Sequence, residues 1–187
     1  MTRKILHLDL DAFFCAVEEL RDPSLKGKPF AVGGQADRRG VVASCSYAAR
    51  IYGVRSAMPM SRALQLCPEL VVVSSQHGNY SEISKQVMAL LDITPFIEKI
   101  SIDEAFMEVS DMQQPLYEIA RDLQQRINQE MRLPISIGGA TNKLVAKIAN
   151  DWGKSQKKSS NPPNAITIIP PGEEAAFLAP LPVQSLW

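Results

Sequence analysis

The chain has few cysteines, no long apolar run and no excess of charge of either sign. Its three cysteines among 187 residues form no CxxC pair, which disfavours a disulfide framework and a cysteine-rich zinc site. Its apolar runs, such as residues 71–73, are too short to cross a bilayer. No apolar stretch of signal-peptide length precedes Asp9. These absences predict a soluble protein of a reducing cytoplasm, with no membrane partner.

Basic residues are unevenly distributed, although twenty basic and twenty acidic side chains cancel. Five arginines and no acidic residue lie within residues 38–62. Five lysines and only one acidic residue, Asp151, lie within residues 143–158. Two basic islands in a neutral chain suit a groove for polyphosphate or nucleic acid with acid-bound cations nearby. On charge alone, an ordinary solvated surface is the favoured alternative.

Alternating and helical spacings predict an α+β fold. Strands are expected at 4–10, 98–102, 105–109 and 135–137, and helices at about 83–91 and 116–131. With residues 11–78 set aside, the order is that of a ferredoxin-like βαββαβ arrangement. Residues 11–78 then form a small, mainly helical insertion after the first strand. A further helix at about 144–152 and a strand at 165–169 follow.

Polar and small residues mark the ends of these elements. The first strand is expected to be half-buried, with His7, Asp9 and Asp11 on its polar face and Asp11 capping the next helix. Ser44 is placed to cap a helix at about 45–52. The strand at 135–137 is expected to end at two glycines, residues 138–139.

Three carboxylates are predicted to meet at one edge of this sheet. Asp9 ends the first strand, and Asp103 and Glu104 form the tip of a hairpin whose strands neighbour it. Converging carboxylates repel one another unless a cation neutralises them, and their hard oxygens select Mg²⁺ or Mn²⁺. Two such ions would activate an attacking hydroxyl and stabilise a leaving pyrophosphate. For any one of these residues alone, the favoured alternative is the ordinary one, in which Asp11 caps a helix and Asp103 and Glu104 lie in a solvated turn. His7, on the face of Asp9, is interpreted as structural.

Four segments resemble motifs of the Y-family DNA polymerases, and of their DinB type most closely. They are residues 9–14 (Asp-Leu-Asp-Ala-Phe-Phe), 44–50 (Ser-Cys-Ser-Tyr-Ala-Ala-Arg), 53–59 (Gly-Val-Arg-Ser-Ala-Met-Pro) and 101–105 (Ser-Ile-Asp-Glu-Ala). The resemblance covers essentially the whole chain in the family's order. It implies a DNA-directed DNA polymerase of the error-prone translesion type, in the bacterial cytoplasm. It also implies a catalytic palm at 1–10 and 79–165, fingers at 11–78, and the start of a thumb at 166–187.

The resemblance assigns a role to each motif residue. Asp9, Asp103 and Glu104 fall on the catalytic carboxylates that hold two Mg²⁺ (or Mn²⁺) ions, with the backbone carbonyl of Leu10 as a further ligand. Phe14 falls on the steric gate that excludes ribonucleotides. The remaining nucleotide-binding residues implied are Ser44, Tyr47, Arg50 and Lys154.

Each of these assignments has an ordinary alternative. Without the resemblance, Phe14 is a core aromatic, Arg50 belongs to a solvated ion pair, and Lys154 lies on the wet side of its helix. The family often follows this lysine with Pro-Asn-Gly, whereas a longer polar loop follows here.

Primer–template DNA and a deoxynucleoside triphosphate are the implied partners. A sliding clamp would bind through regions that family members carry beyond this chain. The chain is therefore expected to be the palm and fingers of a longer polymerase, weakly active by itself. Three other possibilities remain open. The first is a UmuC-like subunit or another Y-family branch, and the second is a catalytically silent nucleic-acid-binding or regulatory relative, which would lack one of the three carboxylates. The third is another palm-type enzyme, such as a nucleotide cyclase, which needs neither a steric gate nor the insertion.

Overall fold

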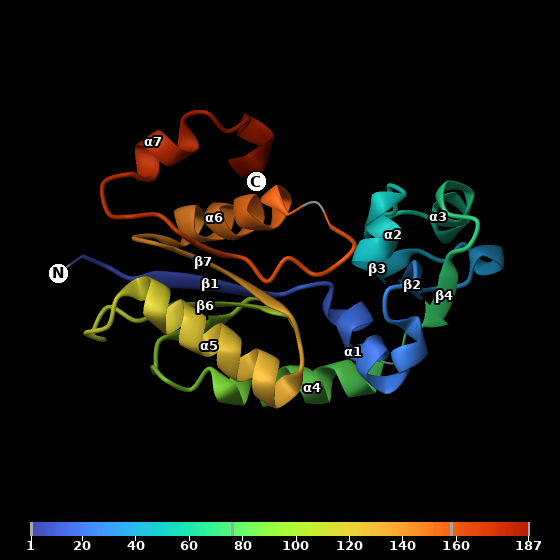
Figure 1. Cartoon of the computed structure of the whole chain (residues 1–187), viewed down its shortest axis with the longest axis horizontal. Coiled ribbons are helices and arrows are strands. Elements are labelled where there is room, and N and C mark those ends of the chain that lie inside the picture. The colour runs from blue at the N-terminus through green and yellow to red at the C-terminus, as the bar shows by residue number, and fades with distance from the viewer. Residues whose placement is uncertain (1, 76, 158, 187) are drawn as a thin grey trace. The chain divides into compact units, whose positions relative to one another are not determined.

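The computed structural model describes residues 2–75, 77–157 and 159–186 (Figure 1). The chain divides into two units. The first comprises Met1–Leu10, Ser84–Lys157 and Pro163–Trp187, and the second comprises Asp11–Ile83 and Lys158–Pro162.

A five-stranded sheet organises the first unit. Its order is β5 (Ile97–Lys99), β6 (Glu104–Glu108), β1 (Ile5–Leu10), β7 (Ile135–Ala140) and β8 (Ile166–Ile168). The first four strands pair antiparallel, in the order of a ferredoxin-like sheet, and β8 pairs parallel to β7. The predicted α+β, ferredoxin-like fold is confirmed. The sheet also extends to residue 168, past the position at which a thumb was expected to start.

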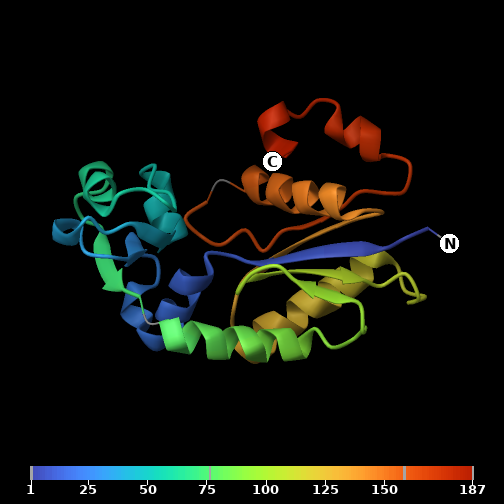
Figure 2. The ribbon, with the colours of Figure 1, turned by 180° about the vertical axis from the view of Figure 1, so that it is seen from behind.

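Helices cover both faces of this sheet. Helix α5 (Leu116–Met131) lies on one face beside the C-terminal part of α4 (His77–Leu90), where Arg126 Nη1 donates to the carbonyl of Leu90 at 3.2 Å. Helix α6 (Lys143–Gln156) lies on the other face, as the opposite views in Figures 1 and 2 show. Strand β1 is therefore buried on both sides, and only Asp9 of its residues is partly exposed. The prediction of a half-buried strand was wrong, because α6 covers the face that carries His7.

Two glycines let the helices approach the sheet closely. Strand β7 continues through Gly138 and Gly139 instead of ending there, as the sequence had suggested. A Cβ atom at Gly138 would lie 2.0 Å from the carbonyl oxygen of Ala146 in α6. At Gly139, a Cβ atom would meet Ile168 and Leu116 side-chain atoms at 2.5 and 3.0 Å. The glycines thus mark close packing within a strand, not its end.

The second unit has a small core between short elements. Its strands are β2 (Phe30–Gly33), β3 (Val42–Cys45) and β4 (Val71–Ser74), in the order β3-β2-β4, with β3 antiparallel and β4 parallel to β2. Its helices are α1 (Phe13–Arg21), α2 (Tyr47–Ile51), α3 (Met60–Leu66) and the 3₁₀ turns η1 (Pro23–Leu25) and η2 (Ala36–Arg38). The buried cluster of this unit consists of Ala31, Val42, Cys45, Ala49, Val54, Met60, Ala63, Cys67 and Leu70.

Two expected helix caps lie elsewhere. The N-cap residue of α1 is Ala12, in a left-handed conformation (φ 49°), instead of Asp11. The N-cap residue of α2 is Ser46, whose hydroxyl accepts a hydrogen bond from the amide of Ala49 at 3.2 Å. Ser44 is buried within β3, so its assignment as the cap was wrong.

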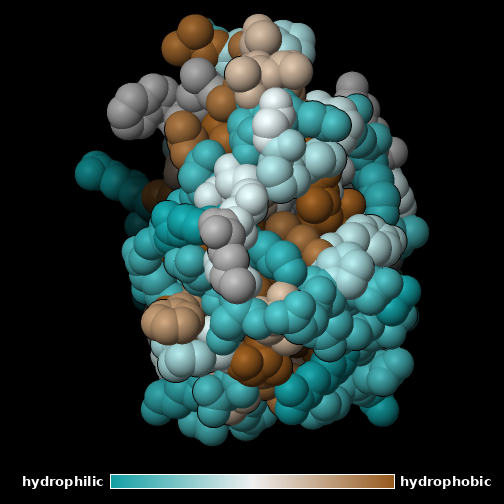
Figure 3. Space-filling model, turned by 90° about the vertical axis from the view of Figure 1, so that its left-hand side faces the viewer, coloured by the Kyte–Doolittle hydropathy of each residue, from teal (hydrophilic) through white to brown (hydrophobic). Residues whose placement is uncertain are grey.

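After β8, helix α7 (Glu174–Leu178) and the 3₁₀ helix η3 (Val183–Leu186) complete the described chain. Phe177 of α7 packs edge-to-face on Trp152 of α6, with ring centroids 5.9 Å apart. Within the described residues, no helix is both long and apolar enough to cross a lipid bilayer. The face in Figure 3 is mostly hydrophilic, with separate hydrophobic areas.

Candidate active site

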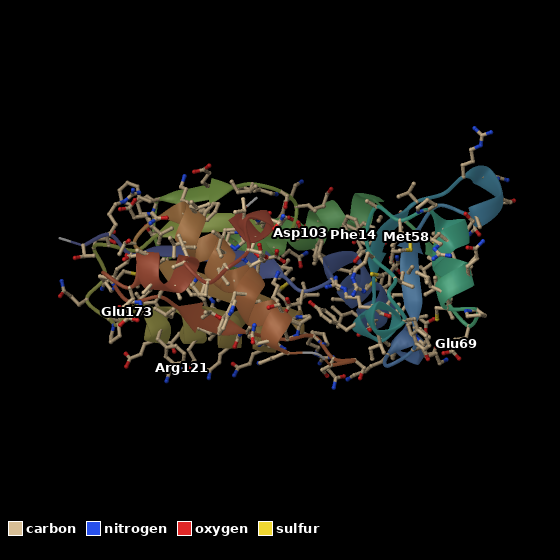
Figure 4. The ribbon with its side chains drawn as sticks, turned by 90° about the horizontal axis from the view of Figure 1, so that it is seen from above. Phe14, Met58, Glu69, Asp103, Arg121 and Glu173 are labelled. Atoms are coloured by element: carbon tan, nitrogen blue, oxygen red, sulfur yellow. The ribbon has the colours of Figure 1, made fainter. Side chains whose placement is uncertain are left out.

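The sheet of the first unit brings two of the predicted acidic segments side by side. Asp9 of β1 pairs in register with Glu104 of β6, and the amide of Leu10 donates to the carbonyl of Asp103 at 3.0 Å. Glu104 is the first residue of β6 and so lies outside the turn, which was expected to include it. Asp103 precedes it in the connection from β5 and is labelled in Figure 4. The pairing of strands, not sequence distance, places the three carboxylates at one end of the sheet.

Helix α6 places two ammonium groups on these carboxylates. Lys154 Nζ lies 2.7 Å from Asp9 Oδ1, and Lys147 Nζ donates to Glu104 Oε1. The two lysines are seven residues apart and therefore share a helix face. Asp103 differs from its two neighbours: its Oδ1 accepts a hydrogen bond from Ser101 Oγ at 2.5 Å, and no ion pair joins it to another described residue.

The charges of this cluster perturb one another. Burial raises the pKa of Asp103, and the negative charges of Asp9 and Glu104 raise it further. The hydrogen bond from Ser101 acts to lower this pKa but does not outweigh them. Burial also acts to raise the pKa of Glu104, but hydrogen bonds from Lys147 and His7 outweigh it and leave that pKa below its ordinary value. Asp103 is thus the carboxylate whose negative charge is least compensated.

These residues fit a divalent cation by their donor chemistry. Among the described residues, no three His, Cys, Asp or Glu side chains are already arranged as a metal site, and lysines occupy two of the carboxylates. The available donors are nevertheless hard oxygens, which Mg²⁺ and Mn²⁺ prefer. The raised pKa of Asp103, caused by burial and by its acidic neighbours, marks the repulsion that such a cation would relieve.

The second unit carries Phe14 at the start of α1 (labelled in Figure 4). Its ring is partly exposed and stacks on Tyr80, with centroids 4.4 Å apart and planes 25° apart. Tyr80 is in turn fixed by its hydroxyl, which donates to the buried Glu18 at 2.6 Å. Phe13 is buried. Phe14 therefore presents a supported ring, whereas its neighbour fills the core.

Tyr47 and Arg50 share one face of α2, as their spacing predicts. The Arg50 guanidinium lies over the Tyr47 ring, 4.2 Å from its centroid, and Arg50 Nε donates to the carbonyl of Cys45 at 3.3 Å. These contacts, one within α2 and one to the last residue of β3, hold the arginine against the start of the helix.

Four residues in these contacts were not singled out for such a role from the sequence. Ser46 caps α2, Tyr80 supports Phe14, Lys147 binds Glu104, and Asn150 of α6 binds the buried His7. Lys147 could have been found by its spacing of seven residues from Lys154. Asn150 carries no such signal, because its contact depends on how α6 lies on the sheet.

Bacterial DNA polymerases are among the curated proteins most similar to this chain. DNA polymerase IV of Pseudomonas fluorescens (strain Pf0-1) is 45% identical over 98% of this chain and 51% of its own length. DNA polymerase IV of Pseudomonas paraeruginosa (strain PA7) is 47% identical over 98% of this chain and 52% of its own length. The chain thus spans about half the length of the curated relatives it matches.

Solved structures and a family model agree with these relatives. DinB from Sulfolobus solfataricus matches with a TM-score of 0.88 and 33% identity, covering 97% of this chain and 52% of that one. An insertion ternary complex of Dbh DNA polymerase matches with a TM-score of 0.87 and 33% identity, covering 97% and 53%. The model of the impB/mucB/samB family matches residues 8–151. The chain belongs to the impB/mucB/samB family.

Proposed function

We propose that this chain is the catalytic part of a DNA-directed DNA polymerase of the translesion type, which adds deoxynucleotides to a primer 3′-hydroxyl. The observation that carries the proposal is the register of β1 and β6, which sets Asp9 opposite Glu104 with Asp103 adjacent. The similarity to DNA polymerase IV along 98% of the chain supports it. A catalytically silent relative would not need three acidic groups at one sheet end, at the cost of their mutual repulsion.

The proposed ligands of two Mg²⁺ ions (or Mn²⁺) are Asp9, Asp103, Glu104 and the backbone carbonyl of Leu10. When bound, such ions make the primer hydroxyl a better nucleophile and neutralise the leaving pyrophosphate. In the absence of these ions, Lys154 neutralises Asp9 and Lys147 neutralises Glu104. Lys154 then pairs with the triphosphate, whose oxygens offer its ammonium group a larger negative charge than Asp9 alone.

The proposed palm corresponds to the first unit and the proposed fingers to the second. In the second unit, Tyr47 and Arg50 bind triphosphate oxygens, for which the planar guanidinium is well shaped. Phe14 acts as the steric gate, since its supported ring cannot move aside for a 2′-hydroxyl. Ser44, buried in β3, stays in the nucleotide-binding set as a prediction.

Primer–template DNA and deoxynucleoside triphosphates are the proposed substrates, and the bacterial cytoplasm the proposed location. A sliding clamp would bind through the half of the relatives' length that this chain does not span.

Primer extension by the full-length gene product, with Mg²⁺ and the four deoxynucleotides, tests this function. Asp103→Asn should lower the rate about 100-fold or more, because a charged oxygen ligand is lost. The variant should fold at least as well as the wild type, since burial and acidic neighbours disfavour this carboxylate. The matched control is Asp111→Asn, an exposed aspartate of the same unit, which should retain the wild-type rate. Equal rates for Asp103→Asn and the wild type would refute the proposed site.

A further inference from the structure

The imidazole of His7 is enclosed in the first unit and contacts one of the proposed metal ligands. Its side chain has 0% exposure, and Nε2 lies 2.5 Å from Glu104 Oε1. The ring packs against Phe106, its register partner on β6, with centroids 4.7 Å apart. The position of the ring is therefore fixed by packing before any polar contact is counted.

Asn150 determines which nitrogen of this ring carries the proton. Its Nδ2 group lies 3.0 Å from His7 Nδ1, 3.3 Å from the His7 carbonyl and 3.1 Å from the Ser136 carbonyl. Two carbonyl oxygens only accept, so the atom that faces all three groups must be the NH₂ nitrogen, whose two hydrogens are shared among them and which cannot itself accept a hydrogen bond. Nδ1 then accepts, and the neutral ring carries its hydrogen on Nε2. Nε2–H therefore donates to Glu104.

Gly138 makes this contact possible. Gly138 pairs with His7 across the β1–β7 register. A Cβ atom at Gly138 would lie 2.5 Å from the backbone nitrogen of Asn150 and 2.9 Å from the Asn150 Cβ atom. Only a glycine at this position lets α6 pack closely enough on the sheet for Asn150 to contact His7.

Both donors to Glu104 use the same oxygen. His7 and Lys147 each bind Oε1, and no other described residue donates to Oε2. The carboxylate is thus held by one oxygen from two directions, and its second oxygen keeps a fixed direction with no partner among the described residues. Hydrogen bonds of this kind orient the ligands of metal sites.

We propose that His7 is a positioning residue: fixed as the Nε2–H tautomer by Asn150, it holds Glu104 Oε1 so that Oε2 is presented to a divalent cation. The proposal rests on the proposed function only for the identity of the ion. Packing alone does not explain the arrangement, because Oδ1 of Asn150 is buried without a partner among the described residues. An apolar pair would fill the same space without that unmet acceptor.

The tautomer can be measured directly by ¹⁵N NMR of the imidazole rings in this chain. The chain has two histidines, and His77→Gln assigns the signals. We expect His7 to be the Nε2–H tautomer in the wild type and to lose that single form in Asn150→Ala. An Nδ1–H tautomer in the wild type, or no change in Asn150→Ala, would overturn the proposal.

The effect on Glu104 can be measured through Mn²⁺ binding, by calorimetry of the chain, and through primer extension by the full-length gene product. His7→Leu should weaken Mn²⁺ binding and lower kcat about 10- to 100-fold, with KM for the deoxynucleotide changed little. His7→Gln, whose amide can still donate to Oε1, should recover part of this loss. Native Mn²⁺ affinity and kcat in a folded His7→Leu would refute the positioning role.

Thr94→Val is the matched control. Thr94 is buried in the same unit, and its hydroxyl donates to the carbonyl of Glu108, at the other end of β6. This variant should have a lower thermal midpoint but unchanged Mn²⁺ affinity and kcat. If Thr94→Val lost as much Mn²⁺ affinity and kcat as His7→Leu does, the role of His7 would be structural only.

If His7→Leu does not fold, Asn150→Ala takes its place with the same expected and contrary results. If the wild type extends no primer, the proposed function fails, whereas the tautomer and the Mn²⁺ affinity still decide the positioning role.

Discussion

At the scale of single residues, burial changes the chemistry of Cys15. Its side chain is 1% exposed, and desolvation raises the pKa of the thiol to about 12. A pKa raised on folding contributes stability that is present below the ordinary value of 9.0 and lost as pH rises from there toward 12. Relative to Cys15→Ala, the free energy of unfolding should therefore fall by up to about 1.4 kcal/mol per pH unit above pH 9. Urea unfolding of both proteins at pH 8, 9 and 10 measures this, and parallel profiles would contradict it.

Phe14 is the residue on which sugar selection should depend. Its ring stacks on Tyr80, which the hydrogen bond to Glu18 holds in place, so the ring cannot retreat from an added hydroxyl. Phe14→Ala should lower the preference for deoxynucleotides over ribonucleotides about 10- to 100-fold. The ratio of the two kcat/KM values measures it. Phe96→Ala, which removes an exposed ring of the first unit, should leave the ratio unchanged. Unchanged discrimination in Phe14→Ala would remove the gate assignment.

Residue identities were predictable where a motif carries them and not where a helix boundary or a tertiary contact decides. Asp9 and Glu104 belong to a motif, and strand pairing then sets them opposite each other. Ser44 and Ser46 both precede the start of α2, and the sequence does not say which serine caps it. Asn150 reaches His7 only because α6 crosses the sheet at that point.

At the scale of elements, the crossing of α6 over the sheet depends on Gly138. Replacing it with alanine would put a methyl group 2.0 Å from the Ala146 carbonyl, a backbone atom that cannot rotate away. Gly138→Ala should therefore destabilise the fold by about 3 kcal/mol or more. A urea midpoint measures the loss, and it should exceed that of Gly78→Ala, where nothing lies within 4 Å of the added atom. Equal midpoints for the two variants would show that α6 can shift without cost.

The strands were predictable in type but not in burial or length. Alternation in β1 identifies two faces, yet it cannot tell that a helix covers the polar one. Two adjacent glycines ordinarily indicate the end of a strand. In β7, their lack of side chains instead lets α6 pack closely at Gly138 and Leu116 of α5 pack closely at Gly139. In each case, a neighbour far away in the sequence decides what the local pattern leaves open.

At the scale of the whole molecule, the chain has a balanced charge and half the length of its relatives. Its arginines at 38–62 lie in the second unit, and the carboxylates with their two lysines lie in the first. Phosphate contacts set both the affinity of a protein for DNA and the steepness of its salt dependence. A protein can therefore carry catalytic residues and still have a low affinity for DNA if it makes few phosphate contacts.

We therefore expect this chain to bind primer–template DNA at least about 10-fold more weakly than DNA polymerase IV of Pseudomonas fluorescens (strain Pf0-1), a longer relative of which the match covers 51%. Its affinity should also fall less steeply with salt, because fewer counterions are released. Fluorescence anisotropy between 50 and 200 mM salt measures both quantities. Asp103→Asn is the internal control: it removes a negative charge, so its DNA affinity should equal or exceed that of the wild type. Equal affinity and equal salt slope for the chain and the longer relative would show that this half of the protein already contains the DNA-binding surface.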